Sequence, residues 1–397
     1  MSIIRVECVR NVASLESLSS DFNRLSAGAA MQRLSWLLPW WEAYQANHKL
    51  HVVVGFRGQN VCGIFPLVES TSALTGRSLV LMGSGKACSD NLGILVEDVD
   101  SEPVASAFAD WLVNSPDCCR WDLLNLDGIR ESNRAMAHFS ESLQALAGTQ
   151  IQRKESPNCW SVSLTGGFDA FKSRLTKRAS KIVRQAESAM DSGKAKFEIA
   201  GTQKEALEFI TEIERMHQAR WQERGIDGCF STSEFSRFLR GAIERMWDDP
   251  WHRDTPMTIP PTDCPFQVTN HQRVQVALLR IDGVVAAGAI CFGDTDALAM
   301  YLVGMNPDFA QDRPGWILNT CAIRYAIELG CARFDFLRGD EEYKQRLGAV
   351  PTVQKRWLIP SRRVTSQVRN VAYRTAVLVK ELWSQTTVEQ PSQPASN

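Results

Sequence analysis

The stretch that decides the fold runs from Asn306 to Ala349, and its second part reads Phe334-Asp335-Phe336-Leu337-Arg338-Gly339-Asp340-Glu341-Glu342-Tyr343-Lys344. Before that part, Pro314-Gly315 begins a segment in which apolar residues recur with a helical period, and Gly330 ends it. Proline suits the first turn of a helix, where free N–H groups and the helix dipole favour a phosphate. A short strand would then bring Asp335, Tyr343 and Lys344 to one place. The stretch therefore predicts a site for group transfer.

The chain also repeats itself weakly. Val52–Gly58 and Val276–Gly283 each read as a strand that ends in a turn, and a second strand follows each of them. A further strand that ends in glycine comes next in both places, and each copy closes with a late strand that contains an aromatic residue and an aspartate, Trp121-Asp122 and Phe334-Asp335. Two copies of one α/β unit in the same order are the simplest interpretation.

Composition narrows the class of protein. The 397 residues suffice for two or three cores, and 44% of them are hydrophobic. The 44 basic residues balance 45 acidic ones, so the sequence predicts no nucleic-acid partner. The histidines lack metal-binding spacing and the eleven cysteines contain no CxxC pair, which predicts no metal site and reduced thiols. The N-terminus has no apolar signal region and no apolar run is long enough to span a bilayer, so we expect a cytoplasmic protein.

These patterns predict two domains. Residues 1–160 would form the first, and residues 161–384 the second, which includes a helical segment at 169–246. Within that segment we expect helices at 169–191, 204–224 and 233–246, and a strand at 196–199. A proline-rich loop of unassigned role covers 248–270. An amphipathic segment at 364–383 is expected to pack on the second domain, although a peripheral membrane contact is possible. A polar tail at 385–397 is expected to be disordered.

The order of these motifs resembles a family. The Pro-Gly helix, Phe-Asp-Phe-Leu-x-Gly and Glu-x-Tyr-Lys are similar to the CelD-type branch of the GNAT acyltransferase superfamily, which is linked to bacterial polysaccharide biosynthesis and related to the FemAB aminoacyl-transferases. Further matching pieces are Ser35-Trp36 with Trp40-Trp41, Gly63 to Leu67, the basic helix from Lys172 to Arg184, and His217-Gln218-Ala219-Arg220-Trp221. The resemblance spans most of Ser35 to Ala349. It implies an α/β tandem GNAT-like fold of two mixed-sheet halves.

The resemblance also implies an acyl-CoA donor, acetyl-CoA in the simplest case. In GNAT enzymes the pyrophosphate lies on a loop of pattern Arg/Gln-x-x-Gly-x-Gly/Ala, and Asp312 to Ile317 is the matching window here. Only the central glycine fits, because Asp312 replaces the Arg or Gln and Ile317 replaces the last small residue. The residues expected to bind the donor are Gly304, Met305, Arg313, Pro314 and Gly315.

The catalytic candidates come from the final turn. FemAB-type enzymes also carry a lysine after an aromatic residue, and there it is taken to stabilise the oxyanion. We assign this role to Lys344, with Tyr343 as proton donor or positioning group and Asp335 or Glu342 as base or lysine partner. The alternative is a surface turn that contains a Glu–Lys pair.

The acceptor candidates lie in the helical region. Arg178, Lys181 and Arg184 belong to a basic helix face that could hold a phosphate-bearing or lipid-linked sugar, or that is simply solvated. His217, Arg220 and Trp221 could line an acceptor cleft, although a hydrogen-bonded, half-buried histidine would fit the same pattern.

The resemblance implies an acyltransferase that acts on a small-molecule or lipid-linked sugar or another cell-envelope precursor. Two alternatives stay open. One is FemAB-like aminoacyl transfer from charged tRNA to a peptidoglycan-type precursor, against which the near-zero net charge argues. The other is a non-catalytic subunit in contact with a polysaccharide synthase.

Overall fold

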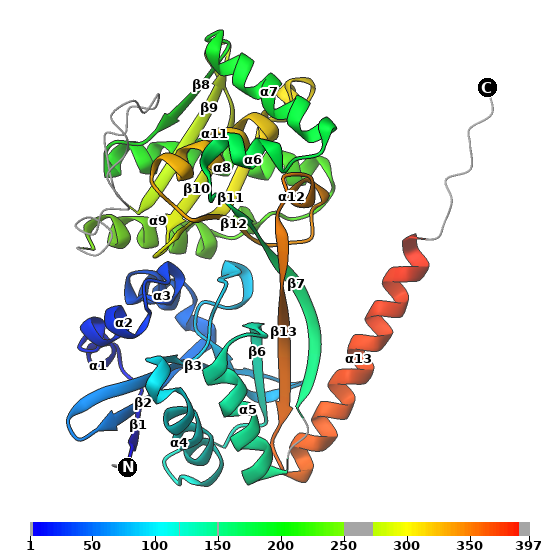
Figure 1. Ribbon diagram of the computed structural model, residues 1–397. Coiled ribbons are helices and arrows are strands. Elements are labelled where there is room, and N and C mark those ends of the chain that lie inside the picture. Colours follow the sequence, from blue (N-terminus) through cyan, green and yellow to red (C-terminus); the bar gives the residue numbers. More distant parts are fainter. Residues whose placement is uncertain (1–2, 119, 149–150, 250–272, 389–397) are drawn as a thin grey trace.

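Two halves of the chain share one 13-stranded sheet in the computed structural model, which describes residues 3–118, 120–148, 151–249 and 273–388 (Figure 1). The strand order is β1-β2-β3-β4-β6-β13-β7-β12-β11-β10-β9-β8, and β5 pairs with β3 off this path. The predicted loop at 248–270 lies almost entirely outside the described residues.

The first half contains most of the small helices. Its strands are β1 (Arg5–Val9), β2 (His48–Arg57), β3 (Asn60–Ser72), β4 (Gly76–Leu81), β5 (Leu95–Val96) and β6 (Leu123–Arg130). Its α-helices are α1 (Val12–Glu16), α2 (Ser19–Leu25), α3 (Leu34–Tyr44), α4 (Ser101–Asn114) and α5 (Arg134–Ala147). Its 3-10 turns are η1 (Ala30–Gln32), η2 (Gln45–Asn47), η3 (Gly85–Ala87) and η4 (Asp98–Asp100).

The second half begins after β7 (Gln152–Ser163). Its strands are β8 (Ala195–Ile199), β9 (Val274–Ile281), β10 (Val284–Gly293), β11 (Ala297–Met305) and β12 (Arg333–Arg338). Its helices are α6 (Gly167–Ser173), α7 (Lys177–Asp191), α8 (Gln203–Glu223), η5 (Cys229–Ser231), α9 (Ser233–Asp248), η6 (Pro307–Asp312), α11 (Pro314–Glu328) and α12 (Glu342–Arg346). The chain then returns through β13 (Val350–Pro360) and α13 (Val364–Val388).

The predicted duplication is visible in the strand pairing. In the first half β2, β3 and β4 are antiparallel neighbours and β4 pairs in parallel with β6. In the second half β9, β10 and β11 are antiparallel neighbours and β11 pairs in parallel with β12. The turn at Asp282-Gly283 has positive φ at both residues, which suits a tight two-residue hairpin. The predicted α/β fold of two mixed-sheet halves is confirmed.

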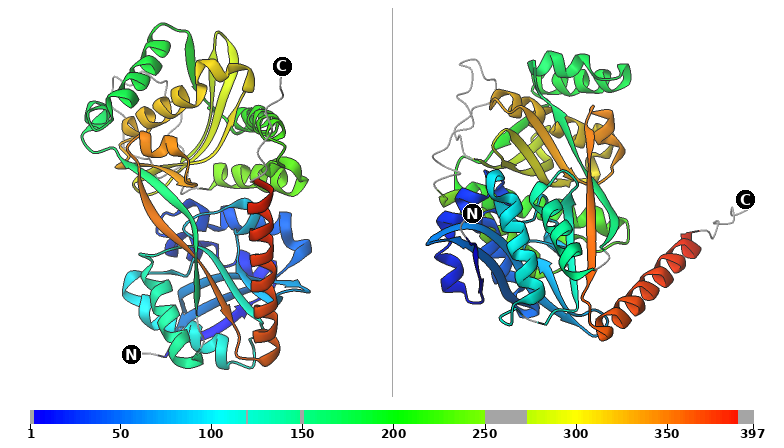
Figure 2. Two further views of the ribbon diagram at one scale, coloured as in Figure 1. Left: turned by 90° about the vertical axis from the view of Figure 1, so that its right-hand side faces the viewer. Right: turned by 60° about the horizontal axis from the view of Figure 1, so that its bottom comes forward.

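The two halves are joined by the long strands β7 and β13. They pair with each other, while β7 also pairs with β12 and β13 also pairs with β6 (Figure 2). The strand β13, which the sequence placed in the second domain, therefore lies against the first half. A division of the chain at residue 160 stays a prediction.

A shared core closes the interface between the halves. Helix α3 packs against α9, as Figure 1 shows. The ring of Trp36 on α3 is fully buried against Phe238, Phe292 and Tyr301, with centroids 4.8 to 5.1 Å apart. Its Nε1 donates to Ser89 Oγ at 2.8 Å. Residues distant in sequence thus fix how the halves face each other.

The structure corrects two helix predictions. The expected helix at 169–191 is broken at Thr176, whose side chain accepts a hydrogen bond from the Ala179 N–H and so begins α7 as a separate helix. Helix α13 contacts the first half rather than the second, because Arg363, Ser366 and Arg369 bind Asp122. It also continues to Val388, past the expected start of the tail.

Candidate active site

Strands β11 and β12 separate soon after they meet. Their parallel ladder covers only Ala297–Ala299 with Arg333–Asp335, although β11 continues to Met305. Opposite β10, Ile290 pairs with Leu302 and Cys291 pairs with Met300, so Tyr301 is the extra residue of a β-bulge. Within the described residues, Met300 to Met305 have no strand partner on the β12 side. An extended ligand can hydrogen-bond to such an edge as another strand would.

A conformational break in β12 keeps this gap open. Leu337 has a φ of 55°, a value that few residues other than glycine adopt. The side chain of Asp335 stabilises the break, because its Oδ1 accepts a hydrogen bond from the Leu337 N–H at 2.8 Å. Burial raises the pKa of Asp335, and Arg130 lies 3.6 Å from its second oxygen. Asp335 therefore shapes the strand, and its role as a base stays a prediction.

The N-terminus of α11 lies just beyond the end of β11. Arg313 precedes the helix in the left-handed conformation, Pro314 occupies the first turn, and no side chain of the described residues caps this end. Asp312, which replaces the Arg or Gln of the GNAT pattern, is paired with Lys194 at 2.8 Å. A pocket of about 180 Å³ opens beside Arg313 and Trp316. These features together suit an anionic group.

Two expected donor-binding glycines are also needed for packing. A Cβ built on Gly304 would lie 2.6 Å from the backbone oxygen of Ile213, so the glycine lets α8 lie directly on β11. A Cβ on Gly315 would lie 2.8 Å from the sulfur of Met305. The Met305 side chain therefore fills the space above Gly315, and a donor that approached this glycine would displace it.

The predicted lysine has different contacts from those we expected. The side chain of Lys344 is 2% exposed, and its Nζ donates to the carbonyl oxygens of Leu337, Arg338 and Gly339 at 3.0 to 3.2 Å. Its ionic partner is Glu341 at 2.9 Å, whereas Glu342 is exposed and pairs with Arg346. Every ammonium hydrogen is thus used inside the turn. The lysine holds the turn between β12 and α12, and the prediction of Glu342 as its partner is wrong.

Tyr343 and Arg220 are brought together across the site. The Tyr343 ring packs edge-on against Phe336 with centroids 5.8 Å apart, and no hydrogen bond of its hydroxyl is found within the described residues. Burial raises the pKa of Tyr343, the charge of Glu341 raises it further, and Arg220 opposes them. Burial also lowers the pKa of Arg220. The site therefore places a protonated phenol close to a half-buried guanidinium.

His217 belongs to the same helix as Arg220, but its ring is occupied. The Nε1 of Trp221 donates to His217 Nε2 at 2.9 Å, and the ring of Phe230 packs edge-on at 5.3 Å. Burial lowers the pKa of His217, so the imidazole is neutral near pH 7. Because its acceptor nitrogen is already bonded, His217 fits the alternative of a hydrogen-bonded, half-buried histidine. The hydrogen bond from Trp221 fixes the orientation of the imidazole ring.

The basic face of α7 is exposed beside α11. Arg178, Lys181 and Arg184 are exposed, and none of them forms an ion pair within the described residues. The C-terminal part of α7 contributes Gln185 and Ala189 to the pocket beside Arg313. The helix that carries the three basic residues thus also forms one wall of this pocket, with neutral side chains.

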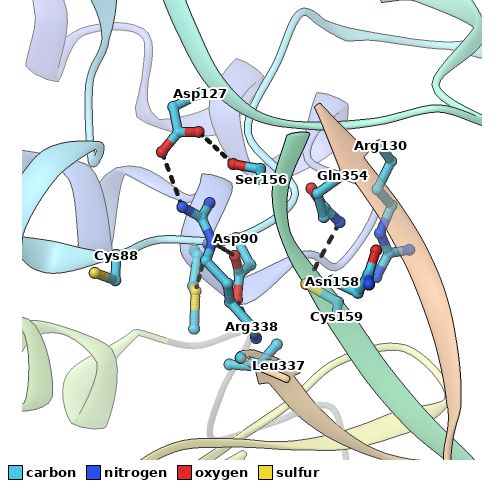
Figure 3. Close-up of polar contacts among 12 residues, drawn as sticks. Cys88, Asp90, Asp127, Arg130, Ser156, Asn158, Cys159, Leu337, Arg338 and Gln354 are labelled. Carbon is cyan, nitrogen blue, oxygen red and sulfur yellow. Dashed lines mark hydrogen bonds and ion pairs between the residues drawn. The ribbon is translucent and has the colours of Figure 1, made fainter. Parts of the chain in front are cut away.

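Sequence reasoning missed the charged cluster that joins the halves. Arg338, at the end of β12, binds Asp90 and Asp127 of the first half, each at 2.9 Å (Figure 3). Asp127 also accepts a hydrogen bond from Ser156. Burial disfavours the charge on Arg338, but the two carboxylates outweigh it and raise its pKa. A Cβ on Gly128 would lie 2.3 Å from the guanidinium, so the glycine makes room for it.

One protein family and several solved structures are similar to this chain. Residues 264–345 match the family described as Acetyltransferase (GNAT) domain. The crystal structure of FemX is similar over 88% of this chain and 96% of its own, with a TM-score of 0.57 and 11% identity. A conserved protein of unknown function from Bacteroides thetaiotaomicron VPI-5482 is similar over 90% of this chain and 100% of its own, with a TM-score of 0.52 and 10% identity. A tandem GNAT protein from the clavulanic acid biosynthesis pathway covers 90% of this chain and 98% of its own, with a TM-score of 0.44 and 11% identity. No curated protein matches this chain.

Two further searches concern the described residues alone. None of the helices there is both long and apolar enough to cross a membrane. The same part of the chain holds no group of three or more His, Cys, Asp or Glu side chains able to bind a metal ion.

At such identities the likeness to FemX shows the fold alone, and the CelD-type resemblance stays a prediction. The domain match covers β9 to α12, the elements that build the gap between β11 and β12. The chain is an acyltransferase whose second half contains the match to a GNAT acetyltransferase domain, within a tandem GNAT-like fold.

Proposed function

We propose that the second half transfers an acyl group from acyl-CoA, acetyl-CoA in the simplest case, to an amine or hydroxyl of a sugar or cell-envelope precursor. The observation that carries the proposal is the gap between β11 and β12, with the β-bulge at Tyr301 inside it and the uncapped end of α11 at its mouth. The free edge of β11 suits an extended thioester arm. The Gly315 N–H and Arg313 suit its phosphates.

The chain's own groups supply positioning and one proton. Attack by the acceptor forms a C–N or C–O bond and breaks the C–S bond of the thioester, and the acceptor's proton passes to solvent. Tyr343 is protonated at neutral pH, so it donates its proton to the departing thiolate and regains one from the solvent, which has taken up the acceptor's proton. Lys344 fixes the turn that carries Tyr343, and Arg220 stabilises negative charge beside it.

The nature of the acceptor follows from charge and from the sequence resemblance. The exposed basic residues of α7, the helix that also forms one wall of the pocket beside Arg313, support an acceptor or donor that carries phosphate, such as a lipid-linked sugar. A role in polysaccharide biosynthesis, and with it contact with a membrane surface or a synthase, rests on the CelD-type resemblance.

FemAB-like aminoacyl transfer is the second candidate. It is favoured by the position of Met305, whose sulfur fills the space above Gly315 and leaves less room for a pyrophosphate. A donor attached to tRNA would not need that space.

Calorimetric titration with acetyl-CoA separates the two functions. We expect binding to the unmodified protein, and about tenfold weaker binding to Arg313→Gln, because a charged hydrogen bond to phosphate is lost. Lys194→Gln should also weaken binding, since it frees the charge of Asp312. Arg374→Gln, an exposed residue on α13, is the matched control. Absence of binding to the unmodified protein, or equal binding to Arg313→Gln, would overturn acyl-CoA as the donor.

A further inference from the structure

A second pocket lies between the first half and the start of α9, at the place in the first half that corresponds to the gap in the second half. It has a volume of about 510 Å³ and is bounded by the end of α3, by β4 and β6, and by the start of α9. Strands β4 and β6 pair only at Ser78–Val80 with Leu123–Asn125, and β6 continues to Arg130. The three-residue turn η3 follows β4 where a long helix follows β11. The helix N-terminus that borders this pocket is that of α9, and the Glu234 carboxylate in its first turn disfavours a phosphate there.

One wall of the pocket is aromatic. Trp40, Tyr44 and His48 follow one another at intervals of four residues, and the centroid of Trp40 lies 5.5 Å from that of Tyr44 and 5.2 Å from that of His48. Trp40 is 2% exposed, and neither its Nε1 nor the Tyr44 hydroxyl has a hydrogen-bond partner within the described residues. Buried indole and phenol groups usually find a partner, and leaving one unmade is costly. Both atoms are closed to solvent as the rings stand, so a ligand that enters between the walls gains these hydrogen bonds when the rings turn toward it.

The opposite wall is polar and nearly balanced in charge. Arg356 Nε donates to Asn125 Oδ1 at 2.8 Å, and Asp127 lies beside them. Lys86 and Glu234 line the rim. Two cations and two carboxylates thus face the space, so a pyrophosphate would meet two negative charges. An aromatic wall opposite amide, carboxylate and guanidinium groups suits a neutral sugar ring, whose apolar face stacks and whose hydroxyls donate and accept.

The pocket is connected to both strands of the proposed acyl site. The hydroxyl of Tyr301, the bulge residue of β11, donates to the carbonyl oxygen of Ala87 at 2.6 Å, next to Lys86. Asp127 binds Arg338 at the end of β12 (Figure 3). A ring held in the pocket would therefore be fixed relative to the gap where the acyl group is transferred.

We propose that the pocket formed by Trp40, Tyr44, His48, Asn125, Asp127 and Arg356 binds a neutral hexose ring of the acceptor. The assignment to the acceptor rests on the proposed function, whereas the binding of a hexose does not. The first half is then the part of the chain that selects the sugar.

Saturation-transfer difference NMR with methyl β-D-glucopyranoside and N-acetylglucosamine tests this directly. We expect transfer to at least one sugar in the unmodified protein and at least tenfold weaker binding in Tyr44→Phe and Arg356→Gln. Tyr44→Phe keeps the ring and removes only the hydroxyl, so its fold should persist, as thermal unfolding would show. Tyr373→Phe on α13 is the matched control and should bind as the unmodified protein does.

Three outcomes would overturn the inference: no transfer to either sugar, equal binding in folded Tyr44→Phe and Arg356→Gln, or displacement of the sugar by inorganic pyrophosphate. Acetyl-CoA titrated into the same samples keeps the two proposals apart. If acetyl-CoA binds and the sugars do not, the pocket inference alone fails. If a sugar binds and acetyl-CoA does not, the pocket inference is supported and the donor proposal fails.

Discussion

Replacing Lys344 by methionine tests whether this lysine acts in the chemistry or supports the turn that carries Tyr343. Its ammonium group donates to three carbonyl oxygens and pairs with Glu341, and its side chain is 2% exposed. Methionine keeps most of the volume but leaves these carbonyls without a donor. At about 1 kcal/mol for each lost hydrogen bond, we expect Lys344→Met to lower the free energy of unfolding by about 3 kcal/mol.

The assay is urea unfolding, combined with acyl transfer measured at a temperature where the variant is folded. If Lys344 supports the turn, stability and kcat fall together, because Tyr343 loses its position. Lys355→Met is the matched control, since Lys355 pairs with an exposed Glu155 and should cost less than about 1 kcal/mol. Unchanged stability with a loss of about 100-fold or more in kcat would refute this reasoning and restore Lys344 as the oxyanion donor.

Gly304→Ala should lower the free energy of unfolding by about 1–3 kcal/mol, because the new Cβ would clash with the Ile213 backbone. Gly241→Ala is the control, since this helical position is uncrowded, and it should be neutral or stabilising. Equal free energies of unfolding for the two variants in denaturant would contradict this. Arg338→Met should destabilise by about 3–5 kcal/mol, since it leaves the buried Asp90 carboxylate and the partly buried Asp127 carboxylate without their guanidinium partner, and a loss below about 1 kcal/mol would show that the cluster does not hold the halves together. Burial raises the pKa of Asp294 to about 6, above its ordinary value of 3.8, so the folded state holds a proton that the unfolded state releases between these pH values. Its contribution to stability should therefore be full below pH 3.8 and fall by up to about 1.4 kcal/mol per pH unit as the pH rises to about 6. Asp294→Asn should remove this fall relative to the unmodified protein in unfolding curves measured across that range, and parallel pH dependences would contradict it.

The fold could be predicted from local signals. Turn residues such as Asp282-Gly283 and the Pro314-Gly315 helix start are determined by backbone geometry, which a single sequence reveals. The order of these signals was enough to indicate two copies of one unit. The path of β13 was not predictable, because its pairing with β6 and β7 depends on partners far away in the chain.

The site was predictable only in part. The sequence pointed to Tyr343 and Arg220, which the structure brings together, but it gave Lys344 and Glu342 the wrong contacts. The i,i+3 pair Glu341–Lys344 and the i,i+4 pair Glu342–Arg346 are both allowed by helical spacing, so spacing alone could not choose.

The charged cluster around Arg338 shows why the other site residues could not be predicted from the sequence. Arg338 lies 248 residues from Asp90 and 211 from Asp127 in sequence, and no local pattern links them. Gly128 was the nearby signal in the sequence. A glycine is needed there because the Arg338 guanidinium approaches it closely, and this approach exists only in the folded chain.

The central claim is that the second half alone holds the acyl donor along β11, with the donor's phosphates at α11. Hydrogen–deuterium exchange with and without acetyl-CoA tests it most directly. We predict slower amide exchange at Met300–Met305 and at Gly315–Ile317, with no change at the end of β4 in the first half. Protection confined to the first half, or no protection anywhere at saturating acetyl-CoA, would contradict the claim.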